Sequence, residues 1–92
     1  MSESVTRTVE IINQRGLHAR ASAKFVKLVA AFEAEVTVSR EGQTVDARSI
    51  MGLMMLAAGV GSTIDITAEG ADAQAALDAL TALVAARFDE EK

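Results

Sequence analysis

Residues 5–31, VTRTVEIINQRGLHARASAKFVKLVAA, decide the fold, because the spacing of their apolar side chains changes once, near the middle. From residue 5 to residue 11 apolar and polar side chains alternate, which is typical of a strand with one buried face. Residues 13–16 interrupt this pattern, and Gly16 can adopt the positive φ angle that a tight turn requires. From residue 19 to about residue 31 the apolar spacing is that of an amphipathic helix.

Both patterns recur along the rest of the chain. Two alternating segments joined by a turn at Glu41 and Gly42 predict a β-hairpin. Ser49 and Asp72 precede helical segments and are the predicted N-caps. The remaining predicted elements are strands at 35–40, 43–47 and 62–68 and helices at 50–58 and 73–88, followed by an acidic tail at 89–92 that is expected to fray.

The order of these elements, β-α-β-β-α-β-α, favours an α+β fold. Strands that alternate apolar and polar residues are covered on one face only, which is typical of an antiparallel sheet with helices on one side. We therefore predict an open-faced two-layer sandwich, with a four-stranded antiparallel sheet and three helices on one face. A chain of 92 residues forms a single domain, 1–92, with a core over about residues 5–88.

The composition excludes several classes of function. The sequence has no cysteine, so it cannot form a disulfide or a thiolate metal site, and one histidine cannot by itself build a zinc site. The longest apolar run, around residues 50–60, is far shorter than the ~20 residues that cross a bilayer. The first residues lack the basic and apolar segments of a signal peptide, so we expect a cytoplasmic protein without a membrane partner. A net charge of −4 without Trp or Tyr argues against nucleic-acid binding.

The negative net charge hides one basic segment. Residues 11–32 contain basic side chains and no acidic one. Such a segment in an acidic protein indicates an anionic partner, although a solvated helix face would have the same composition. The basic residues are Arg15, Arg20, Lys24 and Lys27.

His18 lies at the predicted N-terminus of the first helix. The free backbone N–H groups of Ala19, Arg20 and Ala21, with the positive end of the helix dipole, suit this position to phosphate binding. The dipole favours a neutral, nucleophilic imidazole, and Arg20 can donate charge-assisted hydrogen bonds to a phosphoryl group. Accepting and returning a phosphoryl group requires these features. The plainer alternative is a surface histidine that only replaces an N-cap residue.

Two motifs resemble a known family. Gly16-Leu17-His18-Ala19-Arg20 and Arg48-Ser49-Ile50-Met51-Gly52 are similar to the motifs of HPr, the histidine-containing phosphocarrier of the phosphoenolpyruvate-dependent sugar phosphotransferase system (PTS). The resemblance implies that His18 takes a phosphoryl group on Nδ1 from enzyme I and passes it to an enzyme IIA domain, with Arg20 steadying the group. It implies a covalent phosphohistidine on a carrier that is not an independent catalyst, and no cofactor or metal of its own.

The chain departs from the commoner family pattern after Arg20, where Ala21 stands in place of a proline. The first helical turn tolerates either residue, so we expect the transfer chemistry to survive. Residues 18–24, HARASAK, also resemble the nitrogen-related NPr branch of the family more than the sugar-uptake branch. The acceptor would then be a regulatory IIA protein instead of a sugar permease.

Ser49 is a candidate site of regulation. Its plain role is the N-cap of the second helix. The resemblance implies another role, because a serine in this motif is the target of an HPr kinase/phosphorylase in the family. A phosphate there would place about two negative charges in the docking face and repel an acidic partner. The sequence leaves open whether such a kinase acts on this chain.

The second predicted helix is apolar on nearly every side, so part of it must be exposed unless the helix is buried as a whole. We expect Leu53 and Leu56 in the core and a methionine-rich patch at the surface, where flexible side chains can repack against several partners. An apolar centre with a basic edge suits the transient complexes of a monomer. The predicted docking face comprises Ile50, Met51, Met54, Lys24, Lys27 and Arg48.

Two other classes of function remain open. A regulatory docking module of the same family would bind its partners without His18 ever carrying phosphate. A small-molecule-binding sandwich would need a phosphate loop or a polar pocket. Residues 59–63, GVGST, lack the ending of a phosphate loop and are better explained as a helix stop before a strand.

Overall fold

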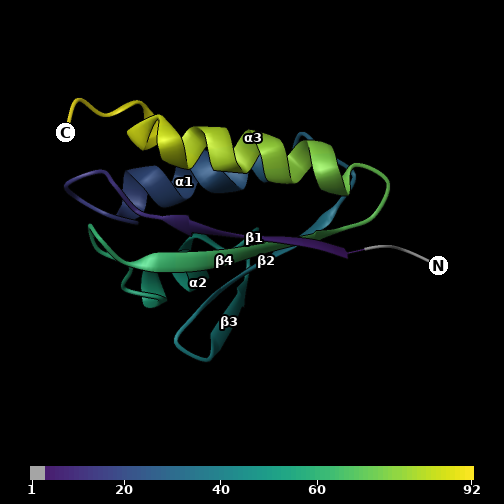
Figure 1. The fold of residues 1–92 in the computed structure, drawn as a ribbon, viewed down its shortest axis with the longest axis horizontal. Coiled ribbons are helices and arrows are strands. Elements are labelled where there is room, and N and C mark those ends of the chain that lie inside the picture. The colour runs from purple at the N-terminus through teal and green to yellow at the C-terminus, as the bar shows by residue number, and fades with distance from the viewer. Residues whose placement is uncertain (1–3) are drawn as a thin grey trace.

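The computed structural model describes residues 4–92 and confirms the predicted order of strands and helices (Figure 1). The strands are β1 (Ser4–Glu10), β2 (Glu35–Arg40), β3 (Gln43–Asp46) and β4 (Thr63–Glu69). The helices are α1 (Ala19–Val29), α2 (Ile50–Met55) and α3 (Ala73–Ala85), and a short 3-10 segment, η1 (Arg87–Asp89), follows α3. Among the described residues, no helix is both long and apolar enough to cross a membrane.

The strands form one antiparallel sheet in the order β1-β4-β2-β3. Because successive side chains on a strand point to opposite faces, β2 and β4 bury Val36, Val38, Ile64 and Ile66 on the same side. The opposite face is polar, as the 3.0 Å hydrogen bond between the hydroxyls of paired Thr6 and Thr67 shows. The predicted open-faced α+β sandwich is confirmed.

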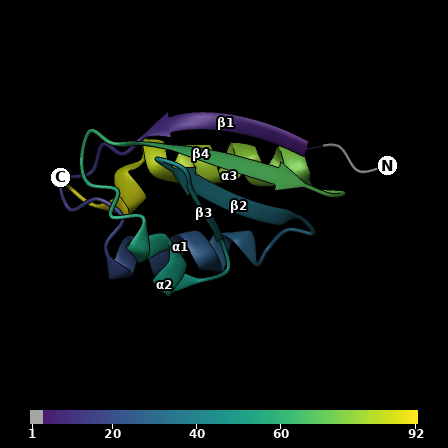
Figure 2. The same ribbon diagram turned by 90° about the horizontal axis from the view of Figure 1, so that it is seen from below.

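The helices form the second layer. α1 and α3 lie side by side over one face of the sheet, and α2 packs against α1 and β3 (Figures 1 and 2). The core fills the space between helices and sheet, where burying each large apolar side chain contributes about 1.5–3 kcal/mol. Its largest fully buried side chains include Phe25, Phe88, Ile11, Leu53, Ile64, Ile66, Leu77 and Leu80.

Helix α2 is shorter than the sequence predicts. It ends at Met55 instead of about residue 58, because the chain leaves the helix at Leu56 and Ala57 has a left-handed φ of 52°. An apolar sequence continues past the helix, and the apolar pattern alone does not mark this turn. The residues after the turn still contribute to the core, since Ala58 is buried.

Helix α3 also ends early, at Ala85 instead of about residue 88. Arg87, Phe88 and Asp89 have φ angles of 57°, 53° and 63°, a left-handed region that residues with a Cβ rarely adopt. This left-handed turn ends the helical path of α3 and leads into the last residues of the chain. Phe88 is fully buried as predicted, but from the turn and not from a helix face.

Asp72 occupies the N-cap position of α3, but its side chain does not cap the helix. Its carboxylate accepts a hydrogen bond from the backbone N–H of Glu33 at 2.8 Å, while its carbonyl accepts from the N–H of Ala76. The prediction that the Asp72 side chain caps α3 was wrong, because its carboxylate accepts a hydrogen bond from the loop before β2 instead of from the first turn of the helix.

The acidic tail differs from the frayed end that the sequence predicts. The backbone N–H of Gln14 donates to the carbonyl of Lys92 at 3.0 Å, and the ammonium group of Lys24 donates to the carbonyl of Phe88 at 2.6 Å. The last residues therefore lie against the loop between β1 and α1. The C-terminal residues thus contact the β1–α1 loop and helix α1, which come from the first third of the chain.

Candidate functional site

A tight turn between β1 and α1 carries the candidate site. Gly16 has a φ of 67°, and a Cβ at this position would lie 2.5 Å from the carbonyl oxygen of Ala58 and 2.8 Å from the Cα of Gly59. The N–H of Leu17 donates to the same Ala58 carbonyl at 2.9 Å. Only glycine fits so close an approach of two backbones, and this contact fixes the start of α1 against the loop after α2.

His18 is the N-cap residue of α1. Its carbonyl accepts the first helical hydrogen bond from the N–H of Ser22 at 2.9 Å, but its imidazole does not cap the helix. The structure shows no backbone hydrogen bond from the N–H groups of Ala19, Arg20 and Ala21 to another of residues 4–92. The side chain of His18 is 24% exposed. A partly exposed imidazole therefore lies beside a helix N-terminus that can bind an anion.

A carboxylate from the far end of the chain holds this imidazole. Nε2 of His18 hydrogen bonds to Oε2 of Glu90. The other oxygen of the carboxylate, Oε1, accepts from Nδ2 of Asn13 at 3.1 Å. Asn13 is fully buried, and its Nδ2 also donates to the carbonyl of Gly16 at 2.9 Å. We call these three side chains the Asn13–Glu90–His18 cluster.

The surroundings of Glu90 favour its ionised form. Its partial burial raises the pKa of the carboxyl, because removal from water penalises the charge. The hydrogen bonds with His18 and Asn13, together with the charges of His18 and Arg15, outweigh this effect and hold the pKa below its ordinary value. Glu90 is therefore a carboxylate at neutral pH and can only accept hydrogen bonds.

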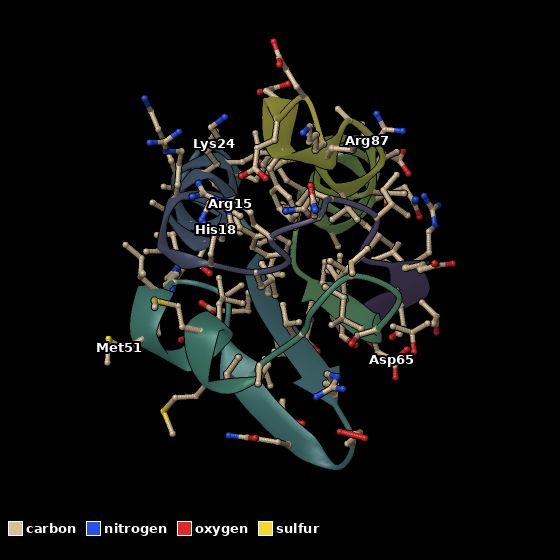
Figure 3. All side chains as sticks on the ribbon, turned by 90° about the vertical axis from the view of Figure 1, so that its left-hand side faces the viewer. Arg15, His18, Lys24, Met51, Asp65 and Arg87 are labelled. Atoms are coloured by element: carbon tan, nitrogen blue, oxygen red, sulfur yellow. The ribbon has the colours of Figure 1, made fainter. Side chains whose placement is uncertain are left out.

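Cationic side chains surround the cluster. Figure 3 shows Arg15, His18 and Lys24 at the end of the molecule that faces the viewer. Arg15, Arg20 and Lys24 line a shallow pocket together with the acidic tail. Lys24 is not a free cation, because it donates to the Phe88 carbonyl and lies 3.9 Å from the carboxylate of Asp89. The sequence predicted that this basic segment meets an anionic partner. In the structure, part of it lies beside the acidic tail of the same chain.

Ser49 is the N-cap of α2, as predicted. Its hydroxyl accepts a hydrogen bond from the backbone N–H of Gly52 at 2.9 Å. Leu53 and Leu56 are buried, and the other large apolar side chains near this helix face solvent. These exposed side chains are Ile50, Met51, Met54 and Met55, of which the sequence pattern did not single out Met55.

The predicted docking residues do not all lie together. Met54 lines the same surface hollow as Arg15 and His18, which joins the exposed face of α2 to the candidate site. Arg48 instead bonds weakly to Glu35, at 3.4 Å, near the start of β2. Lys27 lies farther along α1, beside a shallow groove between α1 and α3.

Sequence reasoning missed two residues of the site. Asn13 has the character of a turn residue and Glu90 that of a solvated tail, because neither belongs to a periodic pattern. A signal was nevertheless present, since Phe88 is a large apolar residue placed directly before the acidic residues. Burial of Phe88 limits how far the residues directly after it can extend from the core. Within residues 4–92, no three His, Asp or Glu side chains come together as a metal site would require.

The fold and the site define a small open-faced sandwich in which a partly exposed histidine lies at an uncapped helix N-terminus. The family model described as "PTS HPr component phosphorylation site" matches residues 5–86. The phosphocarrier protein HPr of Cupriavidus necator is 57% identical over 84 residues, covering 91% of this chain and 94% of the relative. The phosphocarrier protein NPr of Shewanella violacea is 49% identical over 84 residues, covering 91% and 92%.

A solved structure agrees with these sequence matches. The HPr structure from Thermoanaerobacter tengcongensis superposes with a TM-score of 0.91 at 39% identity and covers 96% of this chain and 99% of that one. The chain belongs to the HPr family of PTS phosphocarriers. The role of this family is to transfer phosphoryl groups from enzyme I to enzyme IIA.

Proposed function

We propose that His18 is the phosphoryl acceptor of this phosphocarrier, taking the group on Nδ1 from enzyme I and passing it to an enzyme IIA domain. One observation carries the proposal. The imidazole of His18 lies beside the N-terminus of α1 but makes no hydrogen bond to the backbone N–H groups there. A bound phosphoryl group would find the N–H groups of Ala19, Arg20 and Ala21 within the same helical turn. The partly exposed ring is accessible to two different partner proteins in turn.

The transfer balances without any other reactant. The lone pair of Nδ1 attacks phosphorus, and the bond from phosphorus to enzyme I breaks with its electron pair returning to enzyme I. The phosphorylated ring keeps its Nε2 proton and carries a positive charge. In the second half of the cycle an enzyme IIA side chain attacks phosphorus, and the electron pair of the P–N bond returns to Nδ1.

Electrostatic stabilisation of the transferring group is the main task of the surrounding residues. The three backbone N–H groups and the helix dipole lie where negative charge gathers on the phosphoryl oxygens. Arg20 is exposed at the second residue of α1 and can bring its guanidinium to the same oxygens. Its role is to steady the phosphoryl group as the group moves between proteins.

Partner docking is the second part of the proposal. The exposed apolar side chains Ile50, Met51 and Met54 form the centre of a face that adjoins His18 through Met54. Arg15 lines the same hollow as Met54 and His18 and would help to steer an acidic partner. Of the predicted basic edge, Arg48 precedes α2, whereas Lys24 and Lys27 line a separate groove between α1 and α3. We propose that the protein docks as a monomer, because one partly exposed histidine must reach two partners in turn. We also propose that it does so in the cytoplasm.

Regulation at Ser49 is a separate proposal. The hydroxyl already lies at the N-terminus of α2, where a phosphate is tolerated by the helix dipole. Phosphorylation would add about two negative charges next to Ile50 and Met51 and repel an acidic partner, with little change in fold. Incubation with an HPr kinase and ATP should place one phosphate on the wild type and none on Ser49→Ala. Equal labelling of both proteins would end this proposal.

The test of the main proposal is intact-mass spectrometry after incubation with enzyme I, magnesium and phosphoenolpyruvate. We expect one added phosphate that acid removes and base leaves, present on the wild type and absent from His18→Ala. Lack of phosphate on the wild type, with enzyme I active on another carrier, would favour the alternative of a docking module that never carries phosphate. Phosphate on His18→Ala would exclude His18 as the acceptor. Trials with a sugar-type and a nitrogen-type IIA protein then identify the branch.

A further inference from the structure

We propose that Glu90 is a positioning residue for His18: it holds the proton of the imidazole on Nε2 and so leaves Nδ1 as the unprotonated nucleophile. The proposal rests on the phosphoryl-accepting role proposed for His18. It assigns a function in the transfer reaction to the C-terminal tail of the chain.

The chemistry of the contact decides which ring nitrogen carries the proton. A carboxylate has only acceptor sites, so the nitrogen that hydrogen bonds to it must carry hydrogen. Nε2 of His18 bonds to Oε2 of Glu90. Neutral imidazole has one N–H, and a proton on Nε2 therefore leaves the lone pair of Nδ1 free for attack.

The carboxylate is itself held in place. Its second oxygen accepts from Nδ2 of Asn13 at 3.1 Å, and the same Nδ2 bonds to the carbonyl of Gly16 at 2.9 Å. Asn13 has no exposed surface, and the side chain of Glu90 is only 14% exposed. Both carboxylate oxygens of Glu90 are hydrogen bonded, and the side chain is mostly shielded from solvent. The carboxylate is therefore more firmly oriented than it would be on a solvated tail.

The backbone of the tail is fastened at points on both sides of Glu90. Before it, Phe88 is fully buried and its carbonyl accepts from the ammonium group of Lys24 at 2.6 Å. After it, the carbonyl of Lys92 accepts from the N–H of Gln14 at 3.0 Å. The three residues of η1 have a left-handed backbone conformation that is unfavourable for residues with a Cβ. Such a conformation persists only where the surrounding structure enforces it, and it is frequent at functional sites.

The same contact also serves the phosphorylated ring. With phosphorus on Nδ1 and the proton still on Nε2, the imidazole is positively charged, and the Glu90 carboxylate is the anion that faces that proton. A ring that stays protonated is the better leaving group when the phosphoryl group moves on to enzyme IIA. No proton needs to leave or arrive in either half of the cycle.

The experiment compares the wild-type chain with Glu90→Ala and with Glu91→Ala, a matched loss of one exposed neighbouring carboxylate. ¹⁵N NMR of the His18 ring, on the unphosphorylated proteins at a pH where the ring is neutral, reports which nitrogen carries the proton. Rapid-quench kinetics with enzyme I and phosphoenolpyruvate measure the phosphorylation rate. Both measurements on Glu90→Ala are repeated with added formate, a small carboxylate, against chloride at the same ionic strength.

We expect the Nε2–H form to predominate in the wild type and in Glu91→Ala. Glu90→Ala should have a larger share of Nδ1–H and a phosphorylation rate about tenfold lower, the size of effect typical for loss of one hydrogen bond to a charged group. Formate should restore part of both quantities, and chloride should not. A variant that had merely lost its fold would not recover with formate.

Two results would overturn the proposal while leaving the phosphocarrier function intact. One is a Glu90→Ala protein with the wild-type ring form and the wild-type rate. The other is a Glu90→Ala protein that is phosphorylated faster, which would make the tail a shield over His18. Absence of phosphate on the wild type itself is a different result, since it removes the acceptor role of His18 and the positioning role together.

Discussion

Gly16 is the residue on which the position of His18 depends most directly. The turn that it forms brings the backbone of residues 16 and 17 against the loop that follows α2. The start of α1, with its free N–H groups, is placed by this contact. The missing Cβ of Gly16 therefore permits the contact that fixes the start of α1 at the site.

Substitution of Gly16 by alanine should lower the free energy of unfolding by about 1–3 kcal/mol, because the new Cβ meets a carbonyl oxygen and the backbone is left-handed. Urea unfolding measures the loss. Gly42→Ala is the matched control, since Gly42 has a φ of 84° but no atom within 4 Å of the place where a Cβ would lie. A loss at Gly16 no larger than that at Gly42 would contradict the steric explanation.

Glu90 should make the stability of the protein depend on pH. Its pKa lies below the ordinary 4.5 because hydrogen bonds with His18 and Asn13 and the charges of His18 and Arg15 outweigh its partial burial. A lowered folded-state pKa adds stability above the unfolded pKa, and this stability is lost as the pH falls through the folded value. Urea unfolding should therefore separate wild type from Glu90→Gln at pH 6 and bring them closer together at pH 3. A constant gap at both pH values would exclude the ionised carboxylate as the cause.

Helix α2 is short, and it carries most of the exposed large apolar side chains of the described residues. A helix of 6 residues gains little from its own backbone hydrogen bonds, so its cap and its buried side weigh heavily. Leu53 and Leu56 anchor it, and Ser49 caps it. The exposed methionines of α2, of which Met54 adjoins His18, can therefore differ in conformation without loss of the helix.

Replacement of Ser49 by alanine should cost about 1 kcal/mol of unfolding free energy, because the N–H of Gly52 loses its acceptor. Ser49→Asp should retain nearly all of the stability, since aspartate also caps helices and suits their positive end. Thermal unfolding compares the three proteins. Equal losses in both variants would indicate that the serine is needed for packing and not as a cap.

At the scale of the whole molecule, Phe88 connects the core to the site. It is fully buried beneath the left-handed turn after α3, and Glu90 follows it by two residues. The hydrophobic core thus supplies the free energy that holds an acidic tail next to a histidine from the other end of the chain. Stability and site geometry are coupled through this one aromatic side chain.

Phe88→Ala should lower the free energy of unfolding by about 3–5 kcal/mol, a large part of the about 5–15 kcal/mol typical of a domain. The variant should also change the NMR signals of the His18 ring, because the tail that carries Glu90 loses its anchor. Phe88→Leu, which keeps an apolar side chain, should lose less stability and change the His18 signals less. Unchanged His18 signals in a folded Phe88→Ala protein would show that the tail is held by its polar contacts alone.

The periodic parts of the chain were predictable, because they depend on local side-chain spacing. The alternation at residues 35–40 and the Ser49 cap reappear in the structure with the same residues. Helix ends were less predictable, since the left-handed turns at Ala57 and at Arg87 lie in segments whose composition still suits a helix. The Asp72 carboxylate was assigned to its own helix, although a distant backbone N–H binds it.

What the sequence by itself determined was the order of elements, the open-faced sandwich and the place of His18 at the start of a helix. Each of these follows from spacing and from motifs within a few residues. The tertiary structure alone decided that Glu90 meets His18 and that Asn13 orients it. This cluster joins residues that are more than 70 positions apart in the sequence, and its one local sign is Phe88, an apolar residue directly before the acidic tail. Side-chain spacing within a few residues cannot encode which distant segment such a tail will contact.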